Sequence, residues 1–263
     1  MQRPNPARVV TLTTDFGLAD AYVAAMKAAI LRECPGALLI DVTHQVPRHD
    51  VAAGSIALER AWHAFATGFD RVVHLCVVDP GVGTERRVIA SEVGNALLVC
   101  PDNGLATWTL ARHAPAAGRT WSFGHAFPGA SFVFHGRDVM APLAGRLARG
   151  EAPATLGAQP IGNPLMLDLH PASPGTRTGR VIHLDAFGNC TTNLPRENID
   201  RARAVSAGGR TLPISRTYAD VSPGEPLALI GSSDLLEIAV RQGSAAEALG
   251  LSVGSDVELL EHD

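Results

Sequence analysis

A carboxylate that follows an apolar segment is the first feature of the sequence that could do chemistry. Residues 72–78 are apolar apart from one histidine and lead directly to Asp79, and a Pro-Gly-Val-Gly turn then leads to Arg86. In open α/β sheets, ligands bind outside the carboxyl ends of the strands. The pattern therefore predicts a strand-end acid to which an arginine returns, either as a structural ion pair or as part of a binding site.

Other predicted strands are also followed by polar residues, at Asp15, Thr43-His44, Asp102-Asn103 and His135. One such residue would carry little weight, because loops are usually polar. Polar residues at corresponding positions after five strands predict that one edge of the sheet binds a ligand. Asp79, Arg86 and His135 at neighbouring strand ends could hold a water molecule and bias its proton. The alternatives are structural: a lone histidine is usually hydrogen-bonded in a core, and Asp15 and Asp20 could cap a helix.

The first part of the chain alternates between strand and helix patterns. Short aliphatic or β-branched segments predict strands at 9–14, 37–42, 72–78, 96–100 and 131–134. Amphipathic segments predict helices at 21–32, 51–66 and 139–149. This alternation predicts an N-terminal α/β domain, residues 1–165, with a largely parallel central sheet.

The composition changes after this domain. Residues 166–178 contain a Pro-Ala-Ser-Pro-Gly-Thr stretch that is typical of a linker. Residues 179–263 contain short β-like segments separated by turns rich in Gly, Pro and Ser. These segments predict a smaller β-barrel-like or sandwich domain, in which Phe187-Gly188-Asn189 and Gly231-Ser232-Ser233 look like turns.

The bulk composition excludes several classes of function. The formal charge is −4 and the 22 Lys and Arg residues are spread along the chain, which argues against a nucleic-acid partner. No apolar run is as long as a membrane span, and residues 1–6 lack the apolar core of a secretory signal. Four widely separated cysteines and the spacing of His44 and His49 predict no disulfide framework and no metal site. We therefore expect a cytoplasmic protein with reduced thiols.

Six motifs occur in an order that strongly resembles the S-adenosyl-L-methionine hydroxide adenosyltransferases, relatives of the fluorinase and chlorinase enzymes. The resemblance runs from about residue 9 to the C-terminus. The motifs are Thr14-Asp15-Phe16-Gly17 with Asp20, Asp79-Pro80-Gly81-Val82-Gly83-Thr84-Glu85-Arg86, Pro101-Asp102-Asn103-Gly104, Phe134-His135-Gly136-Arg137-Asp138, Asp185-Ala186-Phe187-Gly188-Asn189 and Gly231-Ser232-Ser233.

The resemblance implies hydrolysis of S-adenosylmethionine, the substrate, to adenosine and L-methionine without a cofactor. It also implies a homotrimer whose active sites lie between the N-terminal domain of one subunit and the C-terminal domain of the next. The family's water-handling triad falls on Asp79, Arg86 and His135. The implied substrate contacts are Asp15 at the ribose, Asp20 near the methionine, Asn103, and the adenine and methionine contacts Phe187, Asn189, Ser232 and Ser233.

The halogenating relatives lack this triad and have a tyrosine at the position of Asp79, and a tryptophan at that of His49. A carboxylate repels a halide strongly in a dry pocket, whereas water can donate a hydrogen bond to it. We therefore expect water to attack the ribose C5′ in line with the departing methionine. The acceptor of the water proton within the triad stays open, and the alternatives are a chlorinase-type halogenase and a non-catalytic adenosine-binding protein.

Overall fold

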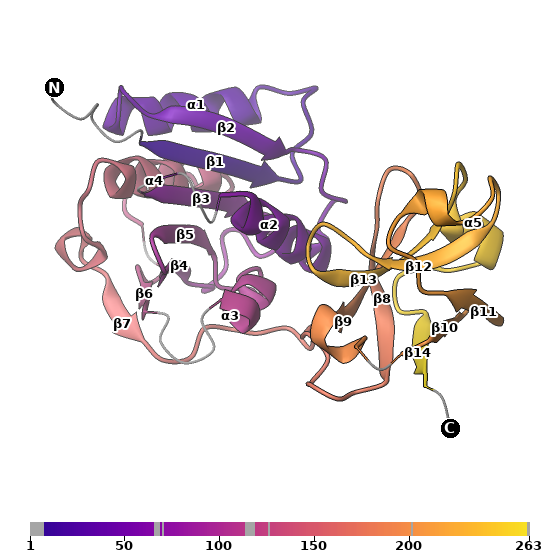
Figure 1. The fold of residues 1–263 in the computed structure, drawn as a ribbon. Helices are drawn as coiled ribbons and strands as arrows, with labels where there is room; N and C mark the ends of the chain where they lie inside the picture. The colour runs from indigo at the N-terminus through magenta and orange to yellow at the C-terminus, as the bar shows by residue number, and fades with distance from the viewer. Residues whose placement is uncertain are drawn as a thin grey trace, which may run out of the picture. The chain divides into compact units, whose positions relative to one another are not determined.

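The computed structural model describes residues 8–65, 69, 71–113, 119–125, 127–200 and 202–261. The chain divides into two compact units, residues 1–169 and 170–263 (Figure 1). Within the described ranges, no helix is long and apolar enough to cross a membrane. The expectations for residues 1–6 and for the end of the second helix at Ala66 lie outside the described residues.

The first unit is built on a seven-stranded sheet in the order β2-β1-β3-β5-β4-β6-β7. Four neighbouring strands are parallel: β2 (Leu38–Thr43), β1 (Val9–Thr14), β3 (Val72–Val77) and β5 (Ala96–Pro101). Three more continue the sheet in antiparallel pairing: β4 (Val88–Val93), β6 (Arg119–Ser122) and β7 (Gln159–Ile161). The predicted α/β class with a largely parallel sheet is confirmed.

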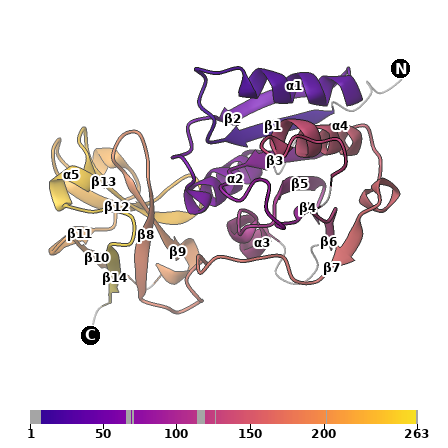
Figure 2. The same ribbon diagram turned by 180° about the vertical axis from the view of Figure 1, so that it is seen from behind.

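Two pairs of helices cover the two faces of this sheet (Figures 1 and 2). They are α1 (Tyr22–Glu33) with α4 (Ala141–Ala148), and α2 (Val51–Phe65) with α3 (Thr107–His113). In β3, Val73 and Leu75 belong to the core beneath α1 and α4, whereas Val72 and Cys76 belong to the core beneath α2 and α3. Successive strand side chains point to opposite faces, so a strand covered on both faces is apolar along its whole length.

The predicted strand at 131–134 is wrong. These residues form a turn, and Phe132 and Val133 are 83% and 78% exposed. The backbone N–H of Ser131 donates to Asp138 and that of Val133 donates to Ser131 Oγ, so this segment satisfies its hydrogen bonds locally. A π-helical turn, Gly136–Met140, follows and continues into α4, so helical structure begins before the predicted residue 139.

The predicted cap at the first helix is also wrong. The residue that precedes α1 is Ala21, and no side chain caps this helix end. Asp20 is exposed one residue earlier, and Asp15 binds elsewhere. Acidic residues before a helix are a sequence signal for capping. Here residues 15–21 form bends and turns before α1 begins, so neither acid occupies the capping position.

The second unit is a nearly closed antiparallel sheet in the order β11-β10-β14-β8-β9-β13-β12. Its strands are β8 (Thr178–Leu184), β9 (Cys190–Pro195), β10 (Ala204–Ala207), β11 (Arg210–Pro213), β12 (Pro226–Ile230), β13 (Leu235–Val240) and β14 (Asp256–Leu260). A bridge between Ile214 and Ala228 brings the two edges together, and a short helix, α5 (Ala245–Leu249), follows β13. The predicted barrel-like domain is confirmed, although the Ala-Val-Ser-Ala segment of β10 has too weak a strand propensity to be foreseen.

Candidate active site

The carboxyl ends of the four parallel strands lie along one edge of the first unit's sheet. Thr14 pairs with Val77, Thr13 with Thr43, and Leu75 with Val99. Because the strands are in register, the polar residues that follow them share this edge, as predicted for Asp15, Thr43-His44, Asp79 and Asp102-Asn103. His135 differs, because it precedes the π-helical turn instead of following a strand.

Arg86 nevertheless joins Asp79 and His135 in one hydrogen-bonded cluster. Its Nε donates to the two carboxylate oxygens of Asp79 at 2.9 and 3.0 Å, and its Nη2 also contacts Asp79 Oδ2. The same Nη2 lies 2.9 Å from His135 Nδ1. The side chains of Arg86 and Asp79 are only 8% and 6% exposed, and His135 is buried as well. Three residues that are distant in sequence thus form a single desolvated group.

The turn after Asp79 returns Arg86 to the strand end. The N–H of Val82 donates to the carbonyl of Asp79, and Thr84 Oγ1 donates to the carbonyl of Gly81 at 2.7 Å. Gly83 has φ +82°, and a Cβ there would lie 2.7 Å from the carbonyl oxygen of Phe132. A glycine is needed here because the loop that carries His135 approaches the turn so closely.

Asn103 braces the same strand end. Its Nδ2 donates to the carbonyl of Val78 at 2.9 Å, and its Oδ1 accepts from the N–H of Leu105. One end of this predicted substrate-binding amide therefore holds the residue that precedes Asp79, and the other end bonds within its own loop.

The arginine also fixes the protonation of His135. Burial lowers the pKa of His135, and the charge of Arg86 lowers it further, against the opposing effects of Asp79 and Asp138. The ring is therefore neutral at pH 7. Since a guanidinium can only donate, Nδ1 must accept from Arg86, and the single ring proton lies on Nε2.

The loop that carries Asp15 contacts the loop that carries His135 through aromatic rings. Oδ2 of Asp15 accepts from the N–H of His49 at 2.9 Å. The ring of the next residue, Phe16, lies 5.9 Å from that of Phe134, and Tyr22 contacts both rings. The rings connect the loop of Asp15 to the loop of His135.

In the second unit, Phe187 and Asn189 line a pocket of about 420 Å³ together with Tyr218, Val240, Gln242 and Gly243. The ring of Phe187 is 78% exposed, whereas the amide of Asn189 is anchored by Asp185 at 3.0 Å. An exposed ring beside a fixed amide is suited to stack on and recognise a flat heterocycle.

Ser232 and Ser233 lie on a separate turn that does not line this pocket. Glu237 connects the two places. Its Oε1 accepts from the hydroxyl of Tyr218 at 2.8 Å, and a Cβ on Gly231 would lie 3.1 Å from its Oε2. Burial, together with the hydrogen bond and charge of Glu237, raises the pKa of Tyr218 to about 12, so the hydroxyl keeps its proton.

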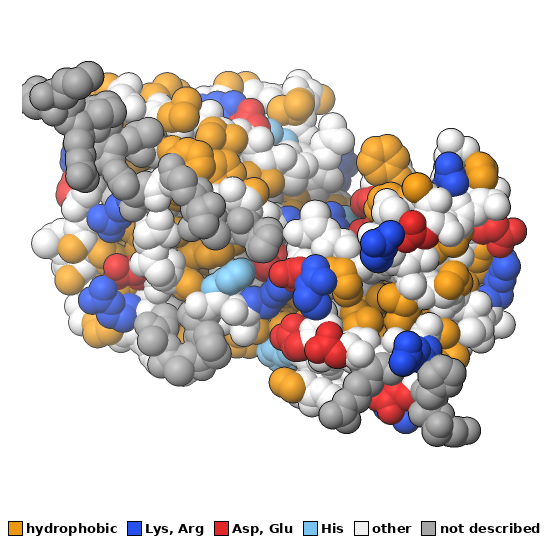
Figure 3. Space-filling model, viewed as in Figure 1, with side chains coloured by type: hydrophobic (Ala, Val, Ile, Leu, Met, Phe, Trp, Pro, Cys, Tyr) orange, Lys and Arg blue, Asp and Glu red, His pale blue; other side chains and the backbone are white. Residues whose placement is uncertain are grey.

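Tyr218 and Gln242 were missed from the sequence. Gln242 has φ +58° in the turn that precedes Gly243. In the sequence, the neighbouring glycine indicates a turn but gives no indication of a pocket. Among the described residues, no three His, Cys, Asp or Glu side chains are grouped to hold a metal ion. Figure 3 shows acidic and basic side chains of the described residues interspersed on one face.

Comparison with known proteins identifies relatives along almost the whole chain. Residues 10–157 match the SAM hydroxide adenosyltransferase N-terminal domain and residues 179–258 match the corresponding C-terminal domain. The (R)-S-adenosyl-L-methionine hydrolase of Thermus thermophilus is 41% identical, over 96% of this chain and 100% of that protein. A fluorinase of an Actinoplanes species is 24% identical, over 95% of this chain and 96% of that protein. The structure of an uncharacterized conserved protein from Thermotoga maritima superposes with a TM-score of 0.83 at 30% identity, covering 96% of this chain and 100% of that one.

Proposed function

Because the chain belongs to the SAM hydroxide adenosyltransferase family, we propose that it is an enzyme that hydrolyses S-adenosyl-L-methionine to adenosine and L-methionine. The observation that carries this proposal is the buried cluster of Asp79, Arg86 and His135. The carboxylate of Asp79 can accept a hydrogen bond from a water molecule, whereas a chloride or fluoride ion has no proton to donate to it.

The reaction is an in-line displacement at the ribose C5′. The oxygen of a water molecule forms a bond to C5′ while the C5′–S bond breaks, and the bonding electrons remain on sulfur. Methionine leaves as a neutral thioether, so its departure needs no general acid. The protein must hold the water opposite sulfur and receive one proton, and positioning of this kind supplies about 7–11 kcal/mol in favourable cases.

The geometry supports distinct roles for the three residues. Arg86 Nη1 is buried and has no hydrogen-bond partner among the described residues, so it can donate to the water oxygen. The neutral ring of His135 carries its proton on Nε2 and is the alternative donor; only one of the two donors can bind the water oxygen, because its other lone pair attacks C5′. Nδ1 of the ring is occupied by Arg86, so His135 has no free nitrogen for the proton of the water. Asp79, whose oxygens have further lone pairs, is the remaining acceptor.

A carboxylate is a sufficient base for this reaction. When water attacks, the immediate product is a protonated 5′-hydroxyl, which is a much stronger acid than a carboxylic acid. The proton therefore moves downhill to Asp79 as the C–O bond forms, and no strong base is required.

Other predicted residues complete the substrate site in this proposal. Asp15 holds the ribose hydroxyls, the pocket with Phe187 and Asn189 holds the adenine, and Asp20, Ser232 and Ser233 contact the methionine. Asn103 contributes indirectly by bracing Val78. The predicted homotrimer with shared active sites and the cytoplasmic location stay predictions.

A product analysis tests the proposal. Purified protein is incubated with S-adenosylmethionine in buffers with and without chloride or fluoride, and the products are separated by chromatography. We expect adenosine and methionine in equal amounts in every buffer. A 5′-halo-adenosine would indicate a halogenase, and bound adenosine without released methionine would indicate a nucleoside-binding protein.

A further inference from the structure

We propose that His44 is a positioning residue that fixes the carboxylate of Asp15 for nucleoside binding without touching the nucleoside. This inference rests on the proposed role of Asp15 at the ribose. His44 is buried and belongs to the loop between β2 and α2, and none of the catalytic steps above uses it.

The loop from His44 to His49 holds the chain on both sides of Asp15. On one side, Nδ1 of His44 lies 2.9 Å from Thr14 Oγ1. On the other side, the carbonyl of His44 accepts from the N–H of Gly17 at 2.7 Å. Two adjacent anchors from one residue leave the Asp15-Phe16 segment little freedom to rotate.

The far end of the same loop binds the carboxylate itself. His49 has φ +66°, a conformation that is uncommon for a residue other than glycine, and its N–H donates to Asp15 Oδ2. Uncommon backbone conformations persist where the surrounding structure enforces them, and they cluster at functional sites. This bond fixes the orientation of the carboxylate, whose remaining lone pairs can receive the ribose hydroxyls.

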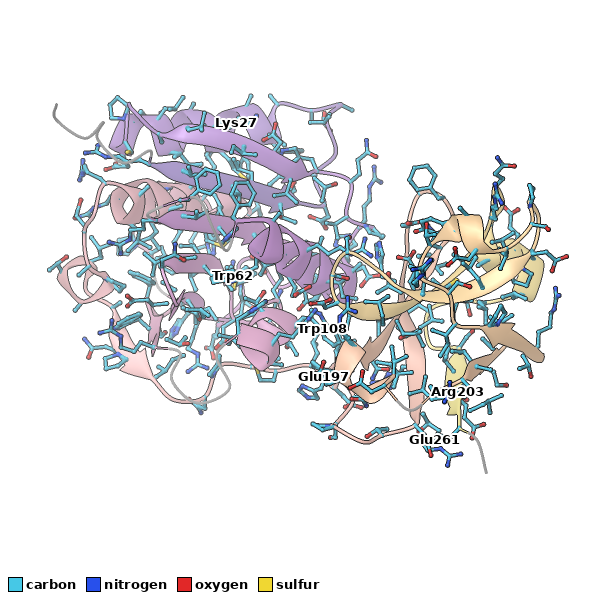
Figure 4. The ribbon with its side chains drawn as sticks, in the orientation of Figure 1. Lys27, Trp62, Trp108, Glu197, Arg203 and Glu261 are labelled. Atoms are coloured by element: carbon cyan, nitrogen blue, oxygen red, sulfur yellow. The ribbon has the colours of Figure 1, made fainter. Side chains whose placement is uncertain are left out.

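A charged pair behind His44 orients its ring. Nε2 lies 3.0 Å from Asp41 Oδ1, and Lys27 Nζ lies 2.6 Å from Asp41 Oδ2. Figure 4 labels Lys27, which α1 places beside β2. Burial would raise the pKa of Asp41, but the Lys27 hydrogen bond and the neighbouring His44 ring outweigh it and lower this pKa. Asp41 is therefore an anion, which favours a proton on Nε2 and leaves Nδ1 to bind the hydroxyl of Thr14.

The chain contains a matched control for a purely structural histidine. His74 is also buried, and its Nδ1 lies 2.8 Å from the hydroxyl of Thr11, another threonine of β1. Thr11 is three residues upstream of Thr14, within the strand and away from the Asp15 loop. A change at His74 thus perturbs a comparable buried bond without affecting the loop.

Two substitutions of His44 test the contributions of its two ring nitrogens separately. The side-chain amide of asparagine reaches the position of Nδ1, whereas that of glutamine reaches the position of Nε2. In His44→Asn the bond to Thr14 survives, and we expect KM for S-adenosylmethionine and Kd for adenosine within about twofold of the parent. In His44→Gln that bond is lost, and both constants should rise roughly 5- to 10-fold, which is the usual effect of one hydrogen bond, with kcat within about twofold.

The measurements are steady-state kinetics and calorimetric titration with adenosine on the parent, both His44 variants and His74→Gln. We expect His74→Gln to lower the melting temperature but to leave KM and the adenosine Kd unchanged. Equal adenosine affinities in His44→Asn and His44→Gln would overturn the inference, as would an equal loss of affinity in His74→Gln. A parent that bound adenosine but released no methionine would refute the proposed hydrolysis, and the adenosine titrations would still decide the role of His44.

Discussion

Exchanging His135 for glutamine and Asp79 for asparagine tests their proposed roles as hydrogen-bond donor and proton acceptor separately. Glutamine retains an N–H near the position of Nε2 of His135 but has no titratable nitrogen. Asparagine retains the shape of Asp79 but cannot take a proton. If His135 only donates a hydrogen bond and Asp79 receives the proton, the first substitution should be tolerated far better than the second.

The expected magnitudes follow from the contacts. His135→Gln loses the bond between Arg86 Nη2 and Nδ1, and a typical net value of about 0.5–1.5 kcal/mol corresponds to roughly a 2- to 13-fold lower kcat. Asp79→Asn loses the base, and general base catalysis contributes about 10²- to 10⁴-fold, or about 2.7–5.5 kcal/mol. The kcat values of the two variants should therefore differ by at least about eightfold.

The assay is methionine release measured between pH 5 and 9, with adenosine affinity as the control for intact binding. In the parent, the pKa of His135 lies below 6.5, so kcat should be constant at neutral pH and fall only as the pH drops below that value and Nδ1 gains a proton facing Arg86. His135→Gln should lack this acid limb. A loss of kcat in His135→Gln as large as that in Asp79→Asn would refute the assignment of Asp79 as the acceptor.

Three further substitutions test the nucleoside contacts and the fold. Asp15→Asn should raise the adenosine Kd by about tenfold or more, because hydrogen bonds to charged groups contribute about 1.5–3 kcal/mol; an unchanged Kd in calorimetry would exclude a ribose contact. Phe187→Ala should weaken adenosine binding while changing the unfolding free energy by less than about 0.5 kcal/mol, since the ring is largely exposed. A large drop in stability would show that the ring packs in the core. Gly104→Ala should destabilise the protein by more than about 1 kcal/mol in denaturant titration, because Gly104 has φ +98° and its new Cβ would lie 2.5 Å from Leu167 Cγ. Gly162→Ala, where nothing lies within 4 Å, is its control and should leave the midpoint almost unchanged.

The edge that carries Asp15 and Asp79 could be predicted because it depends on local pattern. Strands covered on both faces are apolar throughout, and their parallel alignment places the residues after them side by side. The same reasoning failed at His135, because residues 131–134 are as apolar as a strand yet lie exposed in a turn. What brings His135 to Asp79 is a long-range contact with Arg86, which no local pattern encodes.

The pocket of the second unit was harder to predict from the sequence. Phe187 and Asn189 were identified only through the family resemblance, since their own segment indicates no more than a turn. Tyr218 and Gln242 reach the same pocket from segments far along the chain. Their local sequences describe turns and carry no signal of the buried Glu237 that binds the tyrosine.

The ion pair of Asp79 and Arg86 has a consequence for the energy of the bound substrate. The positive charge of the S-adenosylmethionine sulfonium moves from sulfur to the attacking oxygen as the C5′–S bond breaks and the C–O bond forms. In the proposed mechanism, Asp79 lies on the side of the water, so its carboxylate interacts with this charge more strongly in the transition state than in the reactant. With Arg86 as its partner and a neutral His135, Asp79 belongs to a cluster without net charge. The arginine therefore weakens the attraction between Asp79 and the sulfonium of the bound substrate, and the charge leaves the substrate only with the proton that Asp79 is proposed to accept.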